Sequence, residues 1–61
     1  MLDLKAIRTE KGYTQQSLAD AVGIGRTAIT MIESGMNKPS VETAKKLGEI
    51  LGIDWTLFFS D

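Results

Sequence analysis

The sequence contains no cysteine and no histidine, and only one proline among its 61 residues. The lack of cysteine excludes disulfides, and the lack of both cysteine and histidine excludes the usual zinc sites and histidine-based catalysis. The acidic residues form no convergent cluster either, so no nucleophile and base can be paired. We therefore predict that the protein is not an enzyme and binds no cofactor and no metal.

Basic residues are also scarce, because seven Lys and Arg face eight acids and the formal net charge is −1. A DNA-binding domain usually shows a basic surface. The distribution of charge matters more than its sum, since a nearly neutral domain can still present one basic face. The composition predicts modest non-specific binding to DNA and a shallow dependence on salt.

Long apolar runs are missing, and the N-terminus lacks the basic-then-apolar pattern of a signal peptide. We therefore expect no membrane association and a cytoplasmic location. The length allows one domain over residues 1–61. A chain this short buries only about 60% of its unfolded surface, so helix packing and self-association are the means left to stabilise it.

Residues 15–34 contain two short helical patterns joined by a glycine. Thr14 can cap the first pattern, and Gly23 suits the left-handed turn that ends it. The apolar residues of the first pattern lie three and four apart: Leu18, Ala19 and Val22. Gly25 caps the second pattern and Gly35 closes it. The residues expected to face inward in the second pattern are Ala28, Ile29 and Ile32.

Three further helices are expected around this unit, over residues 4–11, 41–51 and 55–59. Asp3, Ser40 and Asp54 are their caps, and Gly12 and Gly52 end the first two. The inner stripe expected for the longest of them consists of Val41, Ala44, Leu47 and Leu51. The sequence thus predicts an all-α domain of five helices.

Residues 15–34, together with ESGMNKPS at 33–40 and LGEILGIDW at 47–55, resemble the Cro/C1-type, or XRE, family of helix-turn-helix DNA-binding proteins. The resemblance extends from residue 4 to residue 59. It implies a lambda-repressor-like fold and a transcriptional regulator that inserts the helix at 25–34 into the major groove. Gly25 departs from the family pattern, which usually has Ser or Thr at this cap.

The outer side of the second motif helix carries the residues that we expect to contact bases: Arg26, Thr27, Thr30 and Met31. They match base-facing positions of the family. Arg26 can form two hydrogen bonds with a guanine edge, and the alternative is a phosphate contact or solvent exposure. Met31 can pack on a thymine methyl group, and the alternative is that it covers Ile24 or the turn.

The residues expected to contact the DNA backbone are Gln15, Gln16, Ser34, Asn37 and Lys38. Gln15 and Gln16 open a helix whose first amides favour a phosphate. The resemblance implies that Gln15 also braces the recognition helix; the plain alternative is that both glutamines are soluble helix formers. Asn37 and Lys38 match a loop that grips the backbone in the family, and otherwise they belong to a solvated loop.

The family resemblance further implies that Arg8 and Glu33 form a structural ion pair. At the C-terminus we expect Trp55, Leu57 and Phe59 to form an apolar patch shared across a two-fold axis. Alternatively, Phe59 folds back onto the helix at 41–51 and leaves Leu57 as an isolated exposed leucine.

From these features we expect a repressor that binds a palindromic operator in double-stranded DNA as a homodimer. The alternative is a protein-interaction module with the same fold, whose nearly neutral surface serves a partner such as a toxin or another repressor.

Overall fold

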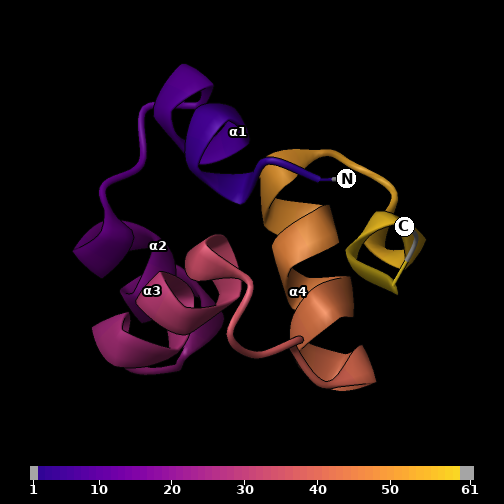
Figure 1. Cartoon of the computed structure of the whole chain (residues 1–61). Helices are drawn as coiled ribbons and strands as arrows, with labels where there is room; N and C mark the ends of the chain where they lie inside the picture. Colours follow the sequence, from indigo (N-terminus) through magenta and orange to yellow (C-terminus); the bar gives the residue numbers. More distant parts are fainter. Residues whose placement is uncertain (1, 60–61) are drawn as a thin grey trace.

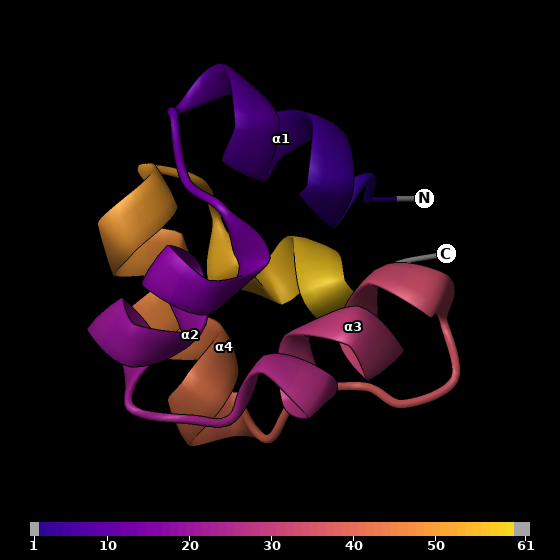
Figure 2. The same cartoon turned by 90° about the vertical axis from the view of Figure 1, so that its left-hand side faces the viewer.

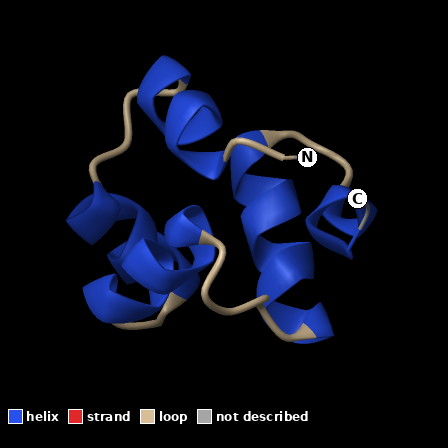
Figure 3. Ribbon diagram, viewed as in Figure 1, coloured by secondary structure: helices blue, strands red, loops and turns tan. Residues whose placement is uncertain are grey.

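The computed structural model describes residues 2–59, which form four α-helices and a short 3₁₀ helix (Figure 1). The elements are α1 (Leu4–Glu10), α2 (Gln15–Val22), α3 (Arg26–Ser34), α4 (Val41–Leu51) and η1 (Trp55–Phe59). Figure 3 shows that loops connect these helices and that residues 2–59 contain no strand. The all-α prediction is confirmed, with two differences of detail: the fifth helix is 3₁₀ rather than α, and α1 ends at Glu10.

Local sequence signals account for the helix boundaries. The side chains of Asp3, Thr14 and Ser40 each accept a hydrogen bond from a backbone amide in the first turn that follows. Gly23 ends α2 with φ of 86°, a left-handed conformation that glycine adopts without steric cost. The amide of Gly23 donates to the carbonyl oxygen of Ala19 at 2.8 Å. The turn toward α3 therefore begins at Gly23, directly after the last residue of α2.

The core is built around α4, which lies between the α2–α3 pair and η1 (Figure 1). Helix α2 packs against both α3 and α4, and α1 packs against α3. The buried apolar residues come from all five elements: Leu4, Leu18, Ala19, Val22, Ile29, Ala44, Leu47, Leu51 and Phe58. All five elements therefore contribute side chains to one continuous core, and α2, α3 and most of α4 do so through the apolar residues that the sequence predicted.

Val41 is the exception to the expected inner stripe of α4, because 53% of its surface is exposed. Its spacing from Ala44 and Leu47 places it on the correct side of the helix. Val41 is, however, the first residue of α4, one turn before Ala44, the first residue that this helix buries (Figure 2). No other helix covers Val41 there, whereas Pro39 in the preceding loop is buried.

The connection from α4 to η1 passes close to the backbone of α4 at Gly48. A Cβ atom on Gly48 would lie 2.8 Å from the carbonyl oxygen of Ile53 and 3.0 Å from Cβ of Trp55. Glycine is therefore required at this position for η1 to pack on α4. At the start of η1, the amide and hydroxyl of Thr56 donate to Oδ1 of Asp54 at 3.0 and 2.7 Å. These bonds to the charged form lower the pKa of Asp54 below its usual value.

Among residues 2–59, every helix is too short or too polar to cross a lipid bilayer.

Candidate nucleic-acid interface

Helix α3 has two chemically distinct sides. Its inner side packs against α2 through Ile29, which is completely buried, and through the half-buried Ala28 and Ile32. Its outer side carries the residues that the sequence assigned to DNA contact. Of these, Arg26, Thr27, Thr30 and Ser34 are exposed, and Met31 is half-buried at the edge of the same face. The structure therefore gathers the predicted base-contacting residues on one accessible surface, which we call the α3 outer face.

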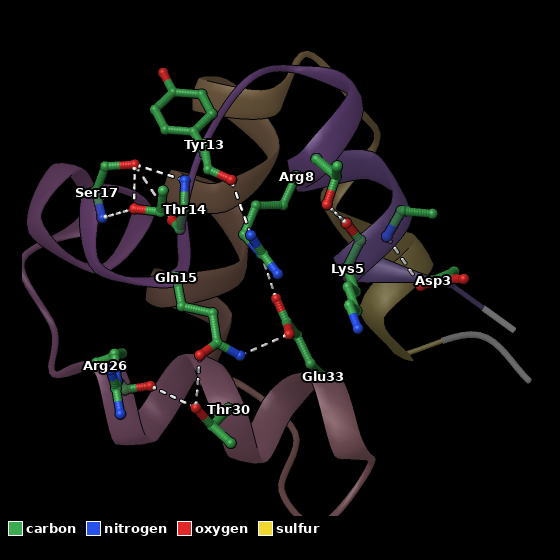
Figure 4. A network of polar contacts seen from close by, with 12 residues as sticks. Asp3, Lys5, Arg8, Tyr13, Thr14, Gln15, Ser17, Arg26, Thr30 and Glu33 are labelled. Atoms are coloured by element: carbon green, nitrogen blue, oxygen red, sulfur yellow. Dashed lines mark hydrogen bonds and ion pairs between the residues drawn. The ribbon is translucent and has the colours of Figure 1, made fainter.

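A buried ion pair holds the C-terminal part of α3. Nε of Arg8 donates to Oε2 of Glu33 at 2.6 Å, and only 10% and 8% of the two side chains are exposed. Nη1 of Arg8 donates to the carbonyl oxygen of Tyr13 at 2.9 Å. As Figure 4 shows, the guanidinium thus joins α1 to the segment before α2 and to α3. It also compensates the buried negative charge of Glu33.

Gln15 continues this network toward the α3 outer face (Figure 4). Its Nε2 donates to Oε1 of Glu33 at 2.9 Å, and its Oε1 accepts from the hydroxyl of Thr30 at 3.4 Å. Both carboxylate oxygens of Glu33 are therefore used, one by Arg8 and one by Gln15. The side chain of Gln15 links the beginning of α2 to the middle of α3, which restrains the angle between the two helices.

The loop from α3 to α4 is attached to Met31. The carbonyl oxygen of Met31 accepts hydrogen bonds from the hydroxyl of Ser34 and the amide of Met36, both at 3.0 Å. It also accepts one from the amide of Asn37 at 3.4 Å. Nδ2 of Asn37 donates to the sulfur of Met31 at 3.2 Å. Sequence reasoning missed this last contact, since it joins two residues whose roles were assigned separately. No periodicity or motif indicates it.

The remaining two residues predicted to contact the DNA backbone, Gln16 and Lys38, do not join the network of Arg8, Gln15 and Glu33. Gln16 is exposed and donates to Oδ1 of Asp20 at 2.9 Å, one turn further along α2. Lys38 is exposed in the loop. Within residues 2–59, neither Lys38 nor Arg26 takes part in an ion pair. Their positive charges are therefore available to an external anion.

The predicted dimer residues lie on η1. The rings of Trp55 and Phe59 meet edge to face, with centroids 6.1 Å apart and planes at 80°. Nζ of Lys45 lies 5.3 Å from the Trp55 ring centroid, as in a cation–π contact. Phe59 therefore packs on Trp55, yet it remains 38% exposed, and Leu57 is 42% exposed. Helix η1 therefore exposes apolar side-chain surface at Leu57 and Phe59.

Comparison of the sequence and the structure with known proteins identifies the family to which this arrangement of helices belongs. The helix-turn-helix family HTH_3 matches residues 4–58, which is nearly the whole chain. The chain belongs to this helix-turn-helix family. The predicted XRE-type resemblance is thereby confirmed, and the helix-turn-helix unit consists of α2, the turn at Gly23 and α3. Proteins of this family are DNA-binding transcriptional regulators and not enzymes.

Individual helix-turn-helix proteins align over most of the chain. The uncharacterized HTH-type transcriptional regulator YqaF of Bacillus subtilis is 59% identical over 58 residues, which cover 95% of this chain and 76% of YqaF. The cryptic phage CTXphi transcriptional repressor RstR of Vibrio cholerae is 28% identical over 95% of this chain, which spans about half (52%) of RstR. The N-terminal DNA-binding domain of SinR from Bacillus subtilis superposes with a TM-score of 0.81 at 25% identity, covering 95% of this chain and 86% of the SinR domain.

Proposed function

We propose that this helix-turn-helix protein is a cytoplasmic repressor that binds a palindromic operator as a homodimer. The observation that carries the proposal is the α3 outer face, which is accessible along its length although the rest of α3 is tied to three other segments. The contacts of Arg8, Gln15 and Glu33 fix the direction of α3. A rigid, exposed helix of this size fits the DNA major groove, which is about 12 Å wide.

In the proposed complex, the α3 outer face lies against base edges. Arg26 donates two hydrogen bonds to a guanine, and the hydroxyls of Thr27 and Thr30 contact neighbouring bases. Met31 supplies apolar contact on the same surface. The flanking phosphates are bound by residues at both edges of this face: Gln15, Gln16, Ser34, Asn37 and Lys38. These contacts set the register of α3 on the duplex, and the base contacts choose the sequence.

The proposed homodimer forms through η1. Leu57 and Phe59 are among the few large apolar side chains that the fold leaves exposed in residues 2–59, and the Phe59 ring packs edge to face on Trp55. Two copies related by a two-fold axis would cover this surface on each other. Such a dimer presents two α3 helices, so its operator is a palindrome with half-sites about 34 Å apart, one helical turn of DNA. Binding through two linked half-sites offsets the small number of cations in each.

The proposed repression follows from the binding of the dimer to its operator. Where the operator overlaps a promoter, the bound dimer excludes RNA polymerase from that promoter. The name of RstR, a repressor of similar sequence, supports this sign of regulation. A reporter gene placed behind the selected operator is expected to lose expression when the protein is supplied. A rise in expression would instead identify an activator.

The two exposed cations near the α3 outer face are expected to play different roles. Arg26→Ala should weaken binding to the preferred operator by about 1–3 kcal/mol per half-site and relax the preference at one base pair, since a bidentate guanine contact is lost. Lys38→Ala should weaken binding to all duplexes alike and reduce the salt slope by about two for the dimer. Fluorescence anisotropy with preferred and scrambled duplexes at several salt concentrations measures both effects.

Equal losses on preferred and scrambled DNA for Arg26→Ala would assign Arg26 to phosphate binding. For the unmodified protein, one phosphate-binding cation per protomer, Lys38, predicts a slope of log K against log salt of about −2 for the dimer. A much steeper slope would show that other basic residues also contact the duplex.

The dimer surface on η1 is expected to tolerate no charge at Leu57. Leu57→Asp should shift the protein to monomer and lower operator affinity by about tenfold or more, while the helical circular dichroism signal stays unchanged. Sedimentation equilibrium from micromolar to millimolar concentration measures the association. Val41→Asp is the matched control, because Val41 is exposed to a similar degree but lies in the first turn of α4, two turns before Gly48, where η1 approaches this helix. A wild-type protein that remains monomeric in concentrated solution and on palindromic DNA contradicts the dimer.

A protein-interaction module is the second candidate, and the observation that favours it is the near-neutral charge with only Arg26 and Lys38 as unpaired cations beside the α3 outer face. Electrophoretic shift of labelled duplexes that is lost on raising salt supports DNA binding. Selection from a pool of random duplexes that enriches no sequence, together with a partner protein retained at high salt, would favour the second candidate.

A further inference from the structure

Met31 is the single apolar side chain on the α3 outer face, whose other members carry a charge or a hydroxyl. A methionine on a helix surface is normally flexible, because its thioether has three rotatable bonds. Here the thioether is held. Its sulfur accepts from Nδ2 of Asn37 at 3.2 Å, and the carbonyl oxygen of Met31 accepts from the amide of Asn37 at 3.4 Å. Asn37 therefore grips the residue at both its side chain and its backbone.

These contacts determine which part of Met31 is left to meet a ligand. The sulfur is the only polar atom of the side chain, and Asn37 already occupies it. The rest of the side chain, which ends in the terminal methyl group, is apolar and is the part left for an apolar ligand group. In the major groove, the apolar group presented by base edges is the C5-methyl of thymine, whereas the other base edges offer donors and acceptors.

We propose that Met31, positioned by Asn37, recognises the C5-methyl group of one thymine in each operator half-site. This rests on the proposed DNA-binding function and names the base feature that the α3 outer face reads besides guanine. It also gives Asn37 a new role. The side chain of Asn37 acts as a positioning residue for Met31, so its loss affects sequence preference and not only phosphate attraction.

The test removes the methyl group and nothing else from the DNA. Duplexes enriched from a random pool by the wild-type protein are resynthesised with deoxyuridine replacing thymidine at one position at a time. Wild type should bind about fourfold more weakly when the contacted thymine is replaced in one half-site, and about fifteenfold when it is replaced in both. This is the loss expected when one methyl group per half-site is no longer buried.

Variants then assign the effect to residues. Met31→Ala should bind the thymine and uracil duplexes equally well, and Met31→Leu should retain part of the discrimination because leucine still presents methyl groups. Asn37→Ala should reduce the discrimination to below about twofold although Met31 is intact. Lys38→Ala is the matched control from the same loop, and it should weaken binding to both duplexes while leaving their ratio unchanged. Circular dichroism verifies that each variant is folded.

The outcomes separate this proposal from the function on which it rests. If the random pool yields no preferred sequence, the DNA-binding function itself fails. If a preferred sequence emerges but no thymine in it is sensitive to deoxyuridine, or if Met31→Ala keeps the fourfold ratio, the Met31 assignment is overturned and the function stands. If Asn37→Ala keeps the full ratio, Asn37 has no positioning role.

Discussion

Replacing Arg8 with methionine is expected to destabilise the domain by about 3–5 kcal/mol. The change leaves the carboxylate of Glu33 buried with only Gln15 as a hydrogen-bond donor, and it removes the donor to the carbonyl oxygen of Tyr13. A domain of this length has a total stability of about 3–9 kcal/mol. Urea unfolding followed by circular dichroism should therefore show a large drop in midpoint or a chain that is already unfolded without denaturant.

A double-mutant cycle tests whether the pair acts as a unit. Combining Arg8→Met with Glu33→Leu should cost less than the sum of the single changes, with a coupling of about 1–3 kcal/mol, because no charge is then left buried. The pair formed by Lys46 and Glu42 is the control. Its atoms are 3.8 Å apart and mostly exposed, so Lys46→Ala should change stability by less than about 0.5 kcal/mol. Additive effects at Arg8 and Glu33 would show that the contact contributes no net coupling.

Truncating Leu47 to alanine is expected to cost about 2–5 kcal/mol. Leu47 is completely buried in α4, which packs against both α2 and η1, and the deleted atoms would leave a cavity that the surrounding helices fill only in part. The same unfolding measurement applies. A loss below about 1 kcal/mol would mean that the helices close onto the smaller side chain and that the core is not rigidly packed around α4.

Val41→Ala is the matched control for Leu47→Ala, because the two residues lie on the same predicted stripe of the same helix. With 53% of its surface exposed, Val41 buries little, and alanine is the better helix former. The change should therefore alter stability by no more than about 0.5 kcal/mol in either direction. A comparable loss at both positions would place Val41 inside the core.

Helix boundaries were predictable from the sequence because the signals that set them are local. A capping side chain such as Thr14 and a left-handed glycine such as Gly23 act within one turn of the backbone. The inward faces of α2 and α3 were predictable for the same reason, since spacing alone decides which residues share a side. The exposure of Val41 was not, because it depends on whether another helix covers the first turn of α4. The 3₁₀ geometry of η1 was not predictable either, because the spacing of apolar residues over five positions does not distinguish a 3₁₀ helix from an α-helix.

For the candidate site, the sequence predicted that the residues of the α3 outer face share one side of the helix, and they do, but it assigned each side chain separately. The helical positions of Arg26, Thr27 and Thr30 follow from periodicity. The hydrogen bond from Asn37 to the sulfur of Met31 depends on one rotamer and on the path of a loop, neither of which leaves a sequence pattern. The bond from Gln15 to Glu33 joins residues 18 positions apart and appears only when both helices are in place.

The division of α3 into an anchored inner side and an unanchored outer side has an evolutionary consequence. Ile29 and Glu33 carry the packing and the ion pair, whereas Arg26 and Thr27 contribute nothing to the core. Mutations at the second pair can therefore accumulate at little cost in folding. Under the proposed function, duplicated copies of this gene would diverge toward different operators through a few substitutions, and specificities could be exchanged by grafting the same positions onto an unchanged scaffold.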